Sequence, residues 1–327
     1  MTTTGELLDR PSAVRLQPAY DDPGEVLSII RAVEEYWPIV RYAGSDKETQ
    51  SLNGNEDTGG FVPPWFRRDF ALHGEPLVPG ADVILRNPHF VDAAHEVYGA
   101  DVLVRPDTVY VNVMVPGPVP FFPHVDIPAF RGVTRADHPV WLLTQMMNSG
   151  LFEHWRIRLA TAVSWFYDGP GGEFHYWPDG AGAESAVIPV PYGNVAVVAD
   201  NERTYHGVAP VGEGSERLVQ GLTRESLLHR VDGGWEMRDG ERLIAHAVDD
   251  EVRITVSWKG EIYADEADRA RVEDHSDDLD LDRAVDMLVA DLRERGVSVD
   301  RPTDPHHDEA WVAAVTDTYA VKGPSVP

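Results

Sequence analysis

The chain has 327 residues, with 55 acidic and 28 basic side chains and a formal net charge of −27 at pH 7. A surface that negative repels phosphate backbones and anionic lipids, which excludes nucleic acid and membranes as partners. Cysteine is absent, so disulfides, thiolate metal sites and thiol nucleophiles are excluded, and any metal must be held by His, Asp or Glu.

The first hundred residues (1–100) are expected to form a helical and loop region that packs on a core. Residues 1–10 lack the apolar centre of a signal peptide, and no stretch reaches ~18 apolar residues, so a cytoplasmic protein is expected. Asp22-Pro23 predicts a helix start, with an apolar face that runs to Trp37. The polar stretch 44–60 is predicted to be a mobile loop or a lid. Asn87-Pro88 predicts a second short helix that ends at Gly99.

The middle of the chain (101–260) is rich in β-branched residues separated by Gly and Pro, which predicts short strands. The expected strands cover 102–115, 157–167, 173–177, 186–190, 194–198, 217–223, 242–247 and 253–258. A segment of helical character interrupts them at about 137–155. Short strands in this number are typical of a mainly β sandwich or closed roll.

The last part (261–327) is expected to be an acidic helical extension. Residues 265–282 are rich in acid, which is typical of a solvated face. Asp280 is a candidate N-cap for a helix that Gly296 ends, and a second helix is expected over 308–319.

The most informative motif is His124-Val125-Asp126. Side chains at positions i and i+2 of an extended segment point to the same side, so this imidazole and this carboxylate can bind one metal ion together. His206 is the best candidate for a third ligand. Two histidines and one carboxylate form the facial triad of non-haem iron(II) oxygenases, which leaves positions open for substrate and oxygen.

The surroundings of this motif resemble the iron(II)/2-oxoglutarate-dependent dioxygenases, particularly the prolyl-hydroxylase-like branch. The pattern follows the expected order over about 105–224: HxD, the turn Gly171-Gly172-Glu173, the Gly193-Asn194 turn, His206-Gly207-Val208, and then Arg217. The resemblance implies a double-stranded β-helix core (jelly-roll, cupin-like) with flanking helices. It also implies iron(II) as the metal and 2-oxoglutarate as the cosubstrate.

Residue by residue, His124, Asp126 and His206 match the iron ligands of that family, and are therefore the expected catalytic residues. Arg217 matches the cation that pairs with the far carboxylate of 2-oxoglutarate. Family members often carry Ser or Thr two residues after this cation, where this chain has Val219. Tyr110, Asn112 or Gln220 could supply the missing donor. Arg224 is the alternative to Arg217, which is preferred on spacing.

The expected function is therefore a hydroxylase, or another oxidising dioxygenase, that acts on a small-molecule metabolite or natural-product intermediate. It would consume O2 and 2-oxoglutarate and release succinate and CO2. Two alternatives stay open on the sequence: a metal enzyme on a cupin-like roll that does not use oxoglutarate, and a non-enzymatic binding protein on the same fold. The sequence does not indicate an oligomeric state.

Overall fold

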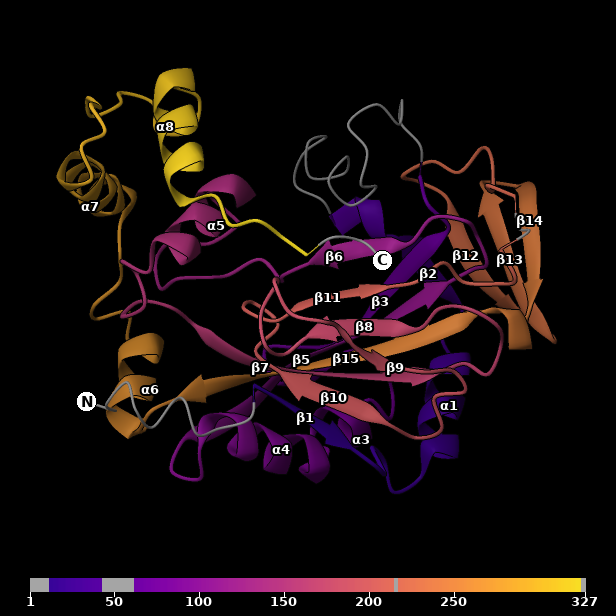
Figure 1. Ribbon diagram of the computed structural model, residues 1–327. Helices are drawn as coiled ribbons and strands as arrows, with labels where there is room; N and C mark the ends of the chain where they lie inside the picture. The colour runs from indigo at the N-terminus through magenta and orange to yellow at the C-terminus, as the bar shows by residue number, and fades with distance from the viewer. Residues whose placement is uncertain (1–11, 43–61, 215–216, 325–327) are drawn as a thin grey trace. The chain divides into compact units, whose positions relative to one another are not determined.

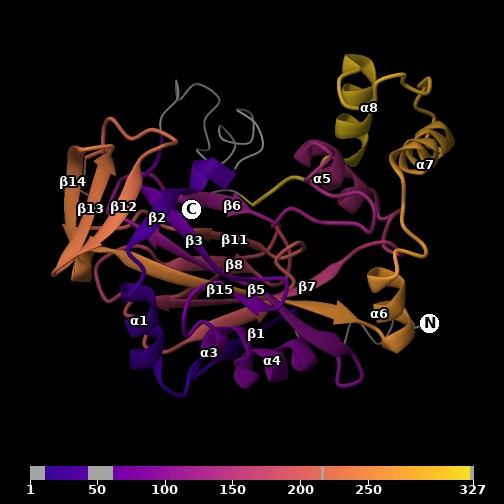
Figure 2. The same ribbon diagram turned by 180° about the vertical axis from the view of Figure 1, so that it is seen from behind.

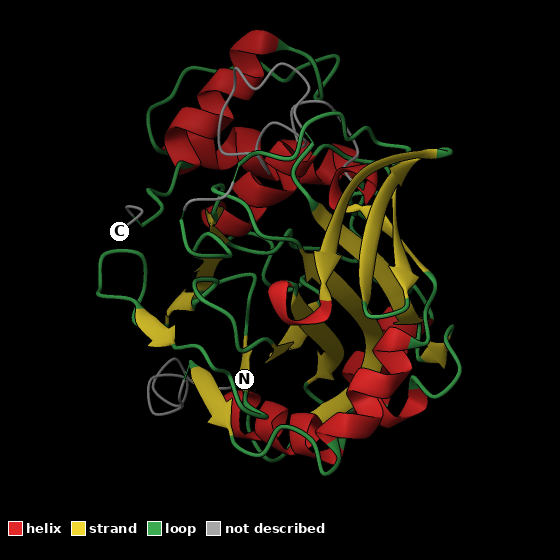
Figure 3. Ribbon diagram, turned by 90° about the vertical axis from the view of Figure 1, so that its right-hand side faces the viewer, coloured by secondary structure: helices red, strands yellow, loops and turns green. Residues whose placement is uncertain are grey.

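The computed structural model of the protein describes residues 12–42, 62–214 and 217–324 (Figure 1). Of the described residues, 32% lie in strands or bridges and 25% in helices, which confirms the mainly β class. Figure 3 shows the strands in yellow and the helices in red. The contacts divide the chain into two compact units. The first contains the described residues up to Val125 together with Leu159–Ile262, and the second contains Asp126–Arg158 and Tyr263–Gly323.

The strands, in chain order, are β1 (Ala13–Leu16), β2 (Glu35–Pro38), β3 (Trp65–Leu72), β4 (Glu75–Pro76), β5 (Leu103–Met114), β6 (Phe121–His124), β7 (Arg158–Phe166), β8 (Phe174–Trp177), β9 (Ala186–Ile188), β10 (Ala196–Ala199), β11 (Tyr205–Val208), β12 (Leu227–Val231), β13 (Gly234–Asp239), β14 (Arg242–Val248) and β15 (Arg253–Tyr263). The helices of the first unit are α1 (Pro23–Arg31), η1 (Ile39–Tyr42), α3 (Asp82–Leu85), α4 (Pro88–Tyr98) and η2 (Asp249–Glu251). Those of the second unit are α5 (Val140–Ser149), α6 (Glu266–Glu273), α7 (Leu281–Glu294) and α8 (Glu309–Tyr319).

Eight of these strands form a double-stranded β-helix. One layer has the order β10-β7-β15-β5, and the other has the order β6-β11-β8-β9. From β5 onward the chain passes back and forth between the two layers, and the residues between them form one apolar cluster that includes Met114, Trp165 and Phe174. The jelly-roll core expected from the sequence is thus present. The larger sheet continues beyond β5 through β3, β2 and the β12-β13-β14 hairpins (Figure 1).

Successive side chains of the central strands point to opposite faces of the larger sheet. On β5, Val109, Val111 and Val113 are fully buried in the cluster that also contains residues of α1, α3 and α4. These helices lie along the outer face of the sheet (Figures 1 and 2). The intervening residues, such as Asn112 and Met114, therefore face the interior of the roll. Strand β15 follows the same rule, with Trp258 on the outer face and Arg253 on the inner one.

Two local predictions were wrong. Residues 217–223 form no strand; Leu218 is exposed, Gly221 has a φ of +85°, and the roll is instead closed by β15, after the β12-β13-β14 insertion. The first helix ends at Arg31 rather than near Pro38, because the chain there joins the sheet as β2, between β3 and β12. Tertiary pairing overrides local periodicity in both places. The predicted loop 44–60 lies outside the described residues.

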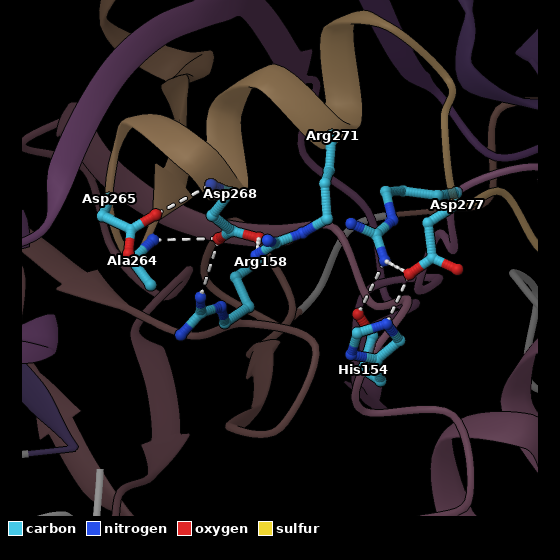
Figure 4. A network of polar contacts seen from close by, with 8 residues as sticks. His154, Arg158, Ala264, Asp265, Asp268, Arg271 and Asp277 are labelled. Carbon is cyan, nitrogen blue, oxygen red and sulfur yellow. Dashed lines mark hydrogen bonds and ion pairs between the residues drawn. The ribbon is translucent and has the colours of Figure 1, made fainter. Parts of the chain in front are cut away.

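The second unit has an apolar core of its own, built from α5, α7, α8 and the segments between them. The two C-terminal helices begin where the sequence predicted: Asp280 caps α7 by accepting from the amide of Arg283, and Asp308 caps α8 by accepting from that of Trp311. Between α6 and α7, Asp277 accepts from His154 (Figure 4). In the described part of the chain, no helix combines the length and apolar character that a bilayer span requires.

Candidate metal centre

The two histidines of the predicted triad come from neighbouring strands. Strands β6 and β11 are antiparallel, and His124 lies directly opposite His206 in their register. Residues that face each other in this way project to the same side of a sheet. Their ring centroids are 4.4 Å apart. Gly207 allows this close pairing, because a Cβ at that position would lie 2.9 Å from the carbonyl oxygen of Phe121.

Asp126 completes the cluster. One ligand atom from each of His124, Asp126 and His206 lies within 4.8 Å of the other two, and this is the only group of three or more His, Asp or Glu residues of this kind among the described residues. His206 is 8% exposed, whereas His124 and Asp126 are half-buried, so the cluster is accessible from one side. Two imidazoles and one carboxylate at this separation fit a divalent metal ion with open positions.

Backbone carbonyls fix both imidazoles in one orientation. Nδ1 of His124 donates to the carbonyl oxygen of Phe122 at 2.9 Å, and Nδ1 of His206 donates to that of Thr204 at 3.0 Å. Because Nδ1 of each ring donates to a carbonyl oxygen, Nε2 is the ring nitrogen that would bind a metal. This is the outer hydrogen bond that metal-binding histidines usually make.

A buried cation lies on the inner face of the same roll. Arg253, the first residue of β15, is 1% exposed. Its guanidinium donates to the carbonyl oxygen of Gly172 at 2.8 Å, to the hydroxyl of Tyr192 at 2.9 Å and to that of Thr255 at 2.6 Å. None of the described carboxylates forms an ion pair with it. A buried charge without a counter-ion is costly, so this position is suited to an anionic ligand.

The neighbours of Arg253 are arranged around it. Gly172 has a φ of +75°, and a Cβ at this residue would lie 3.0 Å from Cδ of Arg253, so only glycine fits without displacement. Burial raises the pKa of the Tyr192 hydroxyl above its ordinary value, although the adjacent Arg253 acts in the opposite direction. That hydroxyl therefore stays protonated at neutral pH and donates to Gly172 while it accepts from the guanidinium.

A series of aromatic contacts runs from the candidate metal ligands to Arg253. His206 lies 6.0 Å from Phe174, Phe174 lies 4.8 Å from Trp165, and Trp165 stacks on Tyr192 at 4.7 Å, all measured between ring centroids. The guanidinium carbon of Arg253 lies 5.3 Å from the Tyr192 ring. The indole Nε1 of Trp165 is buried and has no hydrogen-bond partner. The inner wall of the roll is therefore apolar, with polar groups at its two ends.

The structure places the predicted oxoglutarate residues in different environments. Arg217 and Gln220 are exposed on the stretch after β11, and Arg224 is exposed as well, so none of them faces the interior. Tyr110 is half-buried on β5, where the guanidinium carbon of Arg67 lies 3.7 Å from its ring centroid. Asn112 is also on β5 and faces the roll, and its Oδ1 is buried without a hydrogen-bond partner. Of the four residues, Asn112 is thus the one with a free polar atom in the interior.

The sequence contained a signal for Arg253 that the spacing argument missed. Arg253-Ile254-Thr255 is a basic residue followed two positions later by a threonine, which is the pattern that is absent at Arg217-Leu218-Val219. The β12-β13-β14 insertion moves this pattern further along the chain than expected. Because Arg253 and Thr255 alternate with the buried Ile254, both face the inside of the roll.

The chain matches no family model and no curated protein. Among solved structures, it is similar to an oxidoreductase of the 2OG-Fe(II) oxygenase family from Burkholderia pseudomallei (14% identity, 76% of this chain and 85% of that one, TM-score 0.41). It is also similar to a prolyl-4-hydroxylase from Pseudomonas putida (11%, 79% and 95%, 0.35). A third structure is HygX from Streptomyces hygroscopicus with nickel, 2-oxoglutarate and hygromycin B bound (10%, 80% and 87%, 0.35). At this level of similarity, the activity of this chain has to be argued from its own residues.

Proposed function

We propose that this protein is a non-haem iron(II) and 2-oxoglutarate-dependent oxygenase that hydroxylates, or otherwise oxidises, a small-molecule metabolite or natural-product intermediate. The observation that carries the proposal is the convergence of His124, Asp126 and His206 within 4.8 Å at one side of a double-stranded β-helix. When bound there, iron(II) supplies the chemistry that couples O2 reduction and the oxidative decarboxylation of 2-oxoglutarate to oxidation of the substrate.

The second support is the anion site on the same inner surface. We assign to Arg253 the role that the sequence gave to Arg217: its guanidinium pairs with the far carboxylate of 2-oxoglutarate. Thr255 and Tyr192 already hold the guanidinium, and the Thr255 hydroxyl, which accepts from Arg253, can donate its own proton to a carboxylate. The free Oδ1 of Asn112 can accept a hydrogen bond from the substrate or from an ordered water. The apolar cluster around Trp165 supplies a low-dielectric surrounding, which strengthens the electrostatic interactions of Arg253.

The small-molecule part of the proposal rests on charge. With a net charge of −27, the protein repels nucleic acid, and the three candidate metal ligands are partly or fully buried rather than spread over an open surface. A compact metabolite fits these conditions better than a polyanion does.

The test is an uncoupled assay with full-length protein, iron(II), ascorbate, O2 and 2-oxoglutarate, in which succinate is measured. We expect succinate from the wild type and none above the protein-free control from Asp126→Ala. Arg253→Met should raise the KM for 2-oxoglutarate by at least about 30-fold, because it removes one partner of a buried charge pair. Arg217→Met, an exposed arginine changed in the same way, is the matched control and should leave the KM unchanged.

Other results would support one of the two alternative hypotheses about function. Stoichiometric metal binding that depends on Asp126, without binding of 2-oxoglutarate, would indicate a metal enzyme that does not use oxoglutarate. Absence of stoichiometric iron, cobalt or manganese in the protein would indicate a non-enzymatic binding protein. If Arg217→Met rather than Arg253→Met raised the KM, the proposed anion site would be incorrect while the metal centre would stand.

A further inference from the structure

Two histidines from distant parts of the sequence meet in the second unit, outside the candidate active site. His138 lies just before α5, and His306 lies in the turn before α8. Nδ1 of His138 is 3.2 Å from Nε2 of His306, and the ring centroids are 5.3 Å apart. Both side chains belong to half-buried residues. The sequence alone gave neither of them a role.

The distance between the two nitrogens agrees with shared coordination of one ion. Zinc binds imidazole nitrogen at about 2.0–2.1 Å in tetrahedral geometry, which places two such nitrogens about 3.3 Å apart. The observed 3.2 Å is within this range. The two nitrogens are within hydrogen-bond distance, so one of them carries a proton in the metal-free pair, and an ion bound between them would displace that proton. The rings are inclined at 68°, and rotation of the terminal side-chain torsions would be needed to direct both nitrogens at the ion.

The charges around the pair favour a cation. Asp137 precedes His138 in the chain, and Asp304 accepts a hydrogen bond from the backbone amide of His306 at 3.1 Å. Asp304 also contacts Nδ1 of His307 at 3.0 Å, which keeps that third imidazole directed at the carboxylate.

We propose that His138 and His306 form a second divalent-metal site that takes Zn²⁺, or a similar ion such as Ni²⁺ or Cu²⁺, and joins the segment before α5 to the turn before α8. Imidazole suits these ions. The described residues supply two ligands, so water would complete the coordination shell, and the affinity should be lower than that of a closed four-ligand structural site. The bound ion would stabilise the helical unit through mass action, because it binds only when both segments are in place.

The experiment must first remove the predicted active-site metal. We would use full-length protein with both triad imidazoles replaced (His124→Ala and His206→Ala), stripped with a chelator, and titrate it with Zn²⁺ by calorimetry and equilibrium dialysis. We expect one Zn²⁺ per chain, and a melting temperature that rises by several degrees with Zn²⁺. Adding His138→Ala should weaken binding at least ten-fold and remove the melting shift, and His306→Gln should do the same.

The matched control is His275→Asn. His275 is also a histidine of the second unit with a carboxylate partner, Asp278 at 2.9 Å, but no other described histidine pairs with it. Asn suits its φ of +52°. This variant should bind Zn²⁺ like the background, and all variants should show the same circular dichroism. The proposal is overturned if the background binds no Zn²⁺ up to about 1 mM, or if binding is unchanged by His138→Ala and His306→Gln. Binding should also weaken below about pH 6, as the imidazoles take up protons.

Discussion

Each unit buries at least one arginine, and two of these residues, Arg131 and Arg253, are held in opposite ways. In the second unit, Arg131 is 4% exposed and lies 3.5 Å from the carboxylate of Asp277. The same guanidinium donates to the carbonyl oxygen of His154 at 3.0 Å, and Asp277 also accepts from the imidazole of His154 at 2.6 Å (Figure 4). Its charge is therefore compensated by residues of the protein.

In the roll, Arg253 is buried to the same extent, but its described partners are neutral: a carbonyl oxygen, two hydroxyls and the sulfur of Met114 at 3.7 Å. Hydrogen bonds orient this guanidinium without neutralising it. Both guanidinium groups are buried, but they differ in their partners. Arg131 has a carboxylate of the chain among its two hydrogen-bond partners, whereas the five hydrogen bonds of Arg253 all go to neutral groups. This difference is the basis on which we propose that Arg131 is a structural cation and Arg253 a ligand-binding one.

The largest expected effect comes from replacing each arginine with methionine. Arg253→Met should raise the KM for 2-oxoglutarate by at least about 30-fold. It should lower the melting temperature of the ligand-free protein little or not at all, because an uncompensated buried charge is removed. Arg131→Met should do the reverse: it leaves Asp277 without its buried cation, so the melting temperature falls by several degrees while the KM stays the same.

Scanning calorimetry without ligand and steady-state kinetics with varied 2-oxoglutarate measure the two quantities separately. If Arg253→Met were as destabilising as Arg131→Met and left the KM unchanged, Arg253 would be a structural residue and the contrast between the two units would disappear.

A smaller effect is expected from the glycine that contacts Arg253. Gly172→Ala introduces a Cβ 3.0 Å from Cδ of Arg253 at a φ of +75°. Gly180 is the matched control, since it has a φ of +90° and open space around its Cα. Both variants should lose about 1–2 kcal/mol of stability from the left-handed backbone. Only Gly172→Ala should also weaken 2-oxoglutarate binding, by about ten-fold, because it displaces the guanidinium.

Urea denaturation and ligand titration of the two variants measure these effects. Equal oxoglutarate affinities in Gly172→Ala and Gly180→Ala would show that the position of Arg253 does not depend on this contact, and would weaken the assignment of the anion site.

Much of the roll and its candidate metal ligands could be predicted from the sequence, because the patterns that indicate them lie within short segments of the chain. The pair His124-Val125-Asp126 fixes two ligands by the alternation of an extended chain, and the context of His206 identifies the third. Strands with Val at alternate positions, such as β5, were recognisable for the same reason. Helices α7 and α8 carried their N-caps, Asp280 and Asp308, in the sequence.

The anion site and the His138–His306 pair could not be predicted in this way, because both depend on which distant segments become neighbours. The insertion of β12, β13 and β14 separates β11 from the last strand of the roll, so a residue count from His206 reaches the exposed Arg217 and not Arg253, to which we assign the anion site. Likewise, β2 and β3 are strands because they pair with neighbours in the sheet, and their local sequence gives little indication of it.

The smallest expected effect is on the loss of stability at low pH. It should differ between the two arginines, because only Arg131 has a carboxylate partner that takes up a proton. The hydrogen bond from His154 is the main cause that holds the pKa of Asp277 below its usual range; the neighbouring Arg131 and Arg283 act in the same direction, and partial burial opposes them. A carboxyl group whose pKa is lower in the folded state stabilises that state above its unfolded pKa of about 3.9, and this contribution is lost as the pH falls through the folded value. The wild type should therefore lose part of the stability of the second unit below about pH 4.

Asp277→Asn should remove this dependence. It should be less stable than the wild type at pH 7, and the difference in melting temperature should shrink as the pH falls towards 3. Asp304→Asn, which changes an exposed carboxylate whose pKa His307 also lowers, is the control and should have a smaller effect at pH 7. Arg253 has no carboxylate of the described chain to lose, so Arg253→Met should show the acid transition of the wild type unchanged. A melting difference between Asp277→Asn and the wild type that stays constant from pH 7 to pH 3 would mean that Asp277 does not compensate Arg131 by its charge.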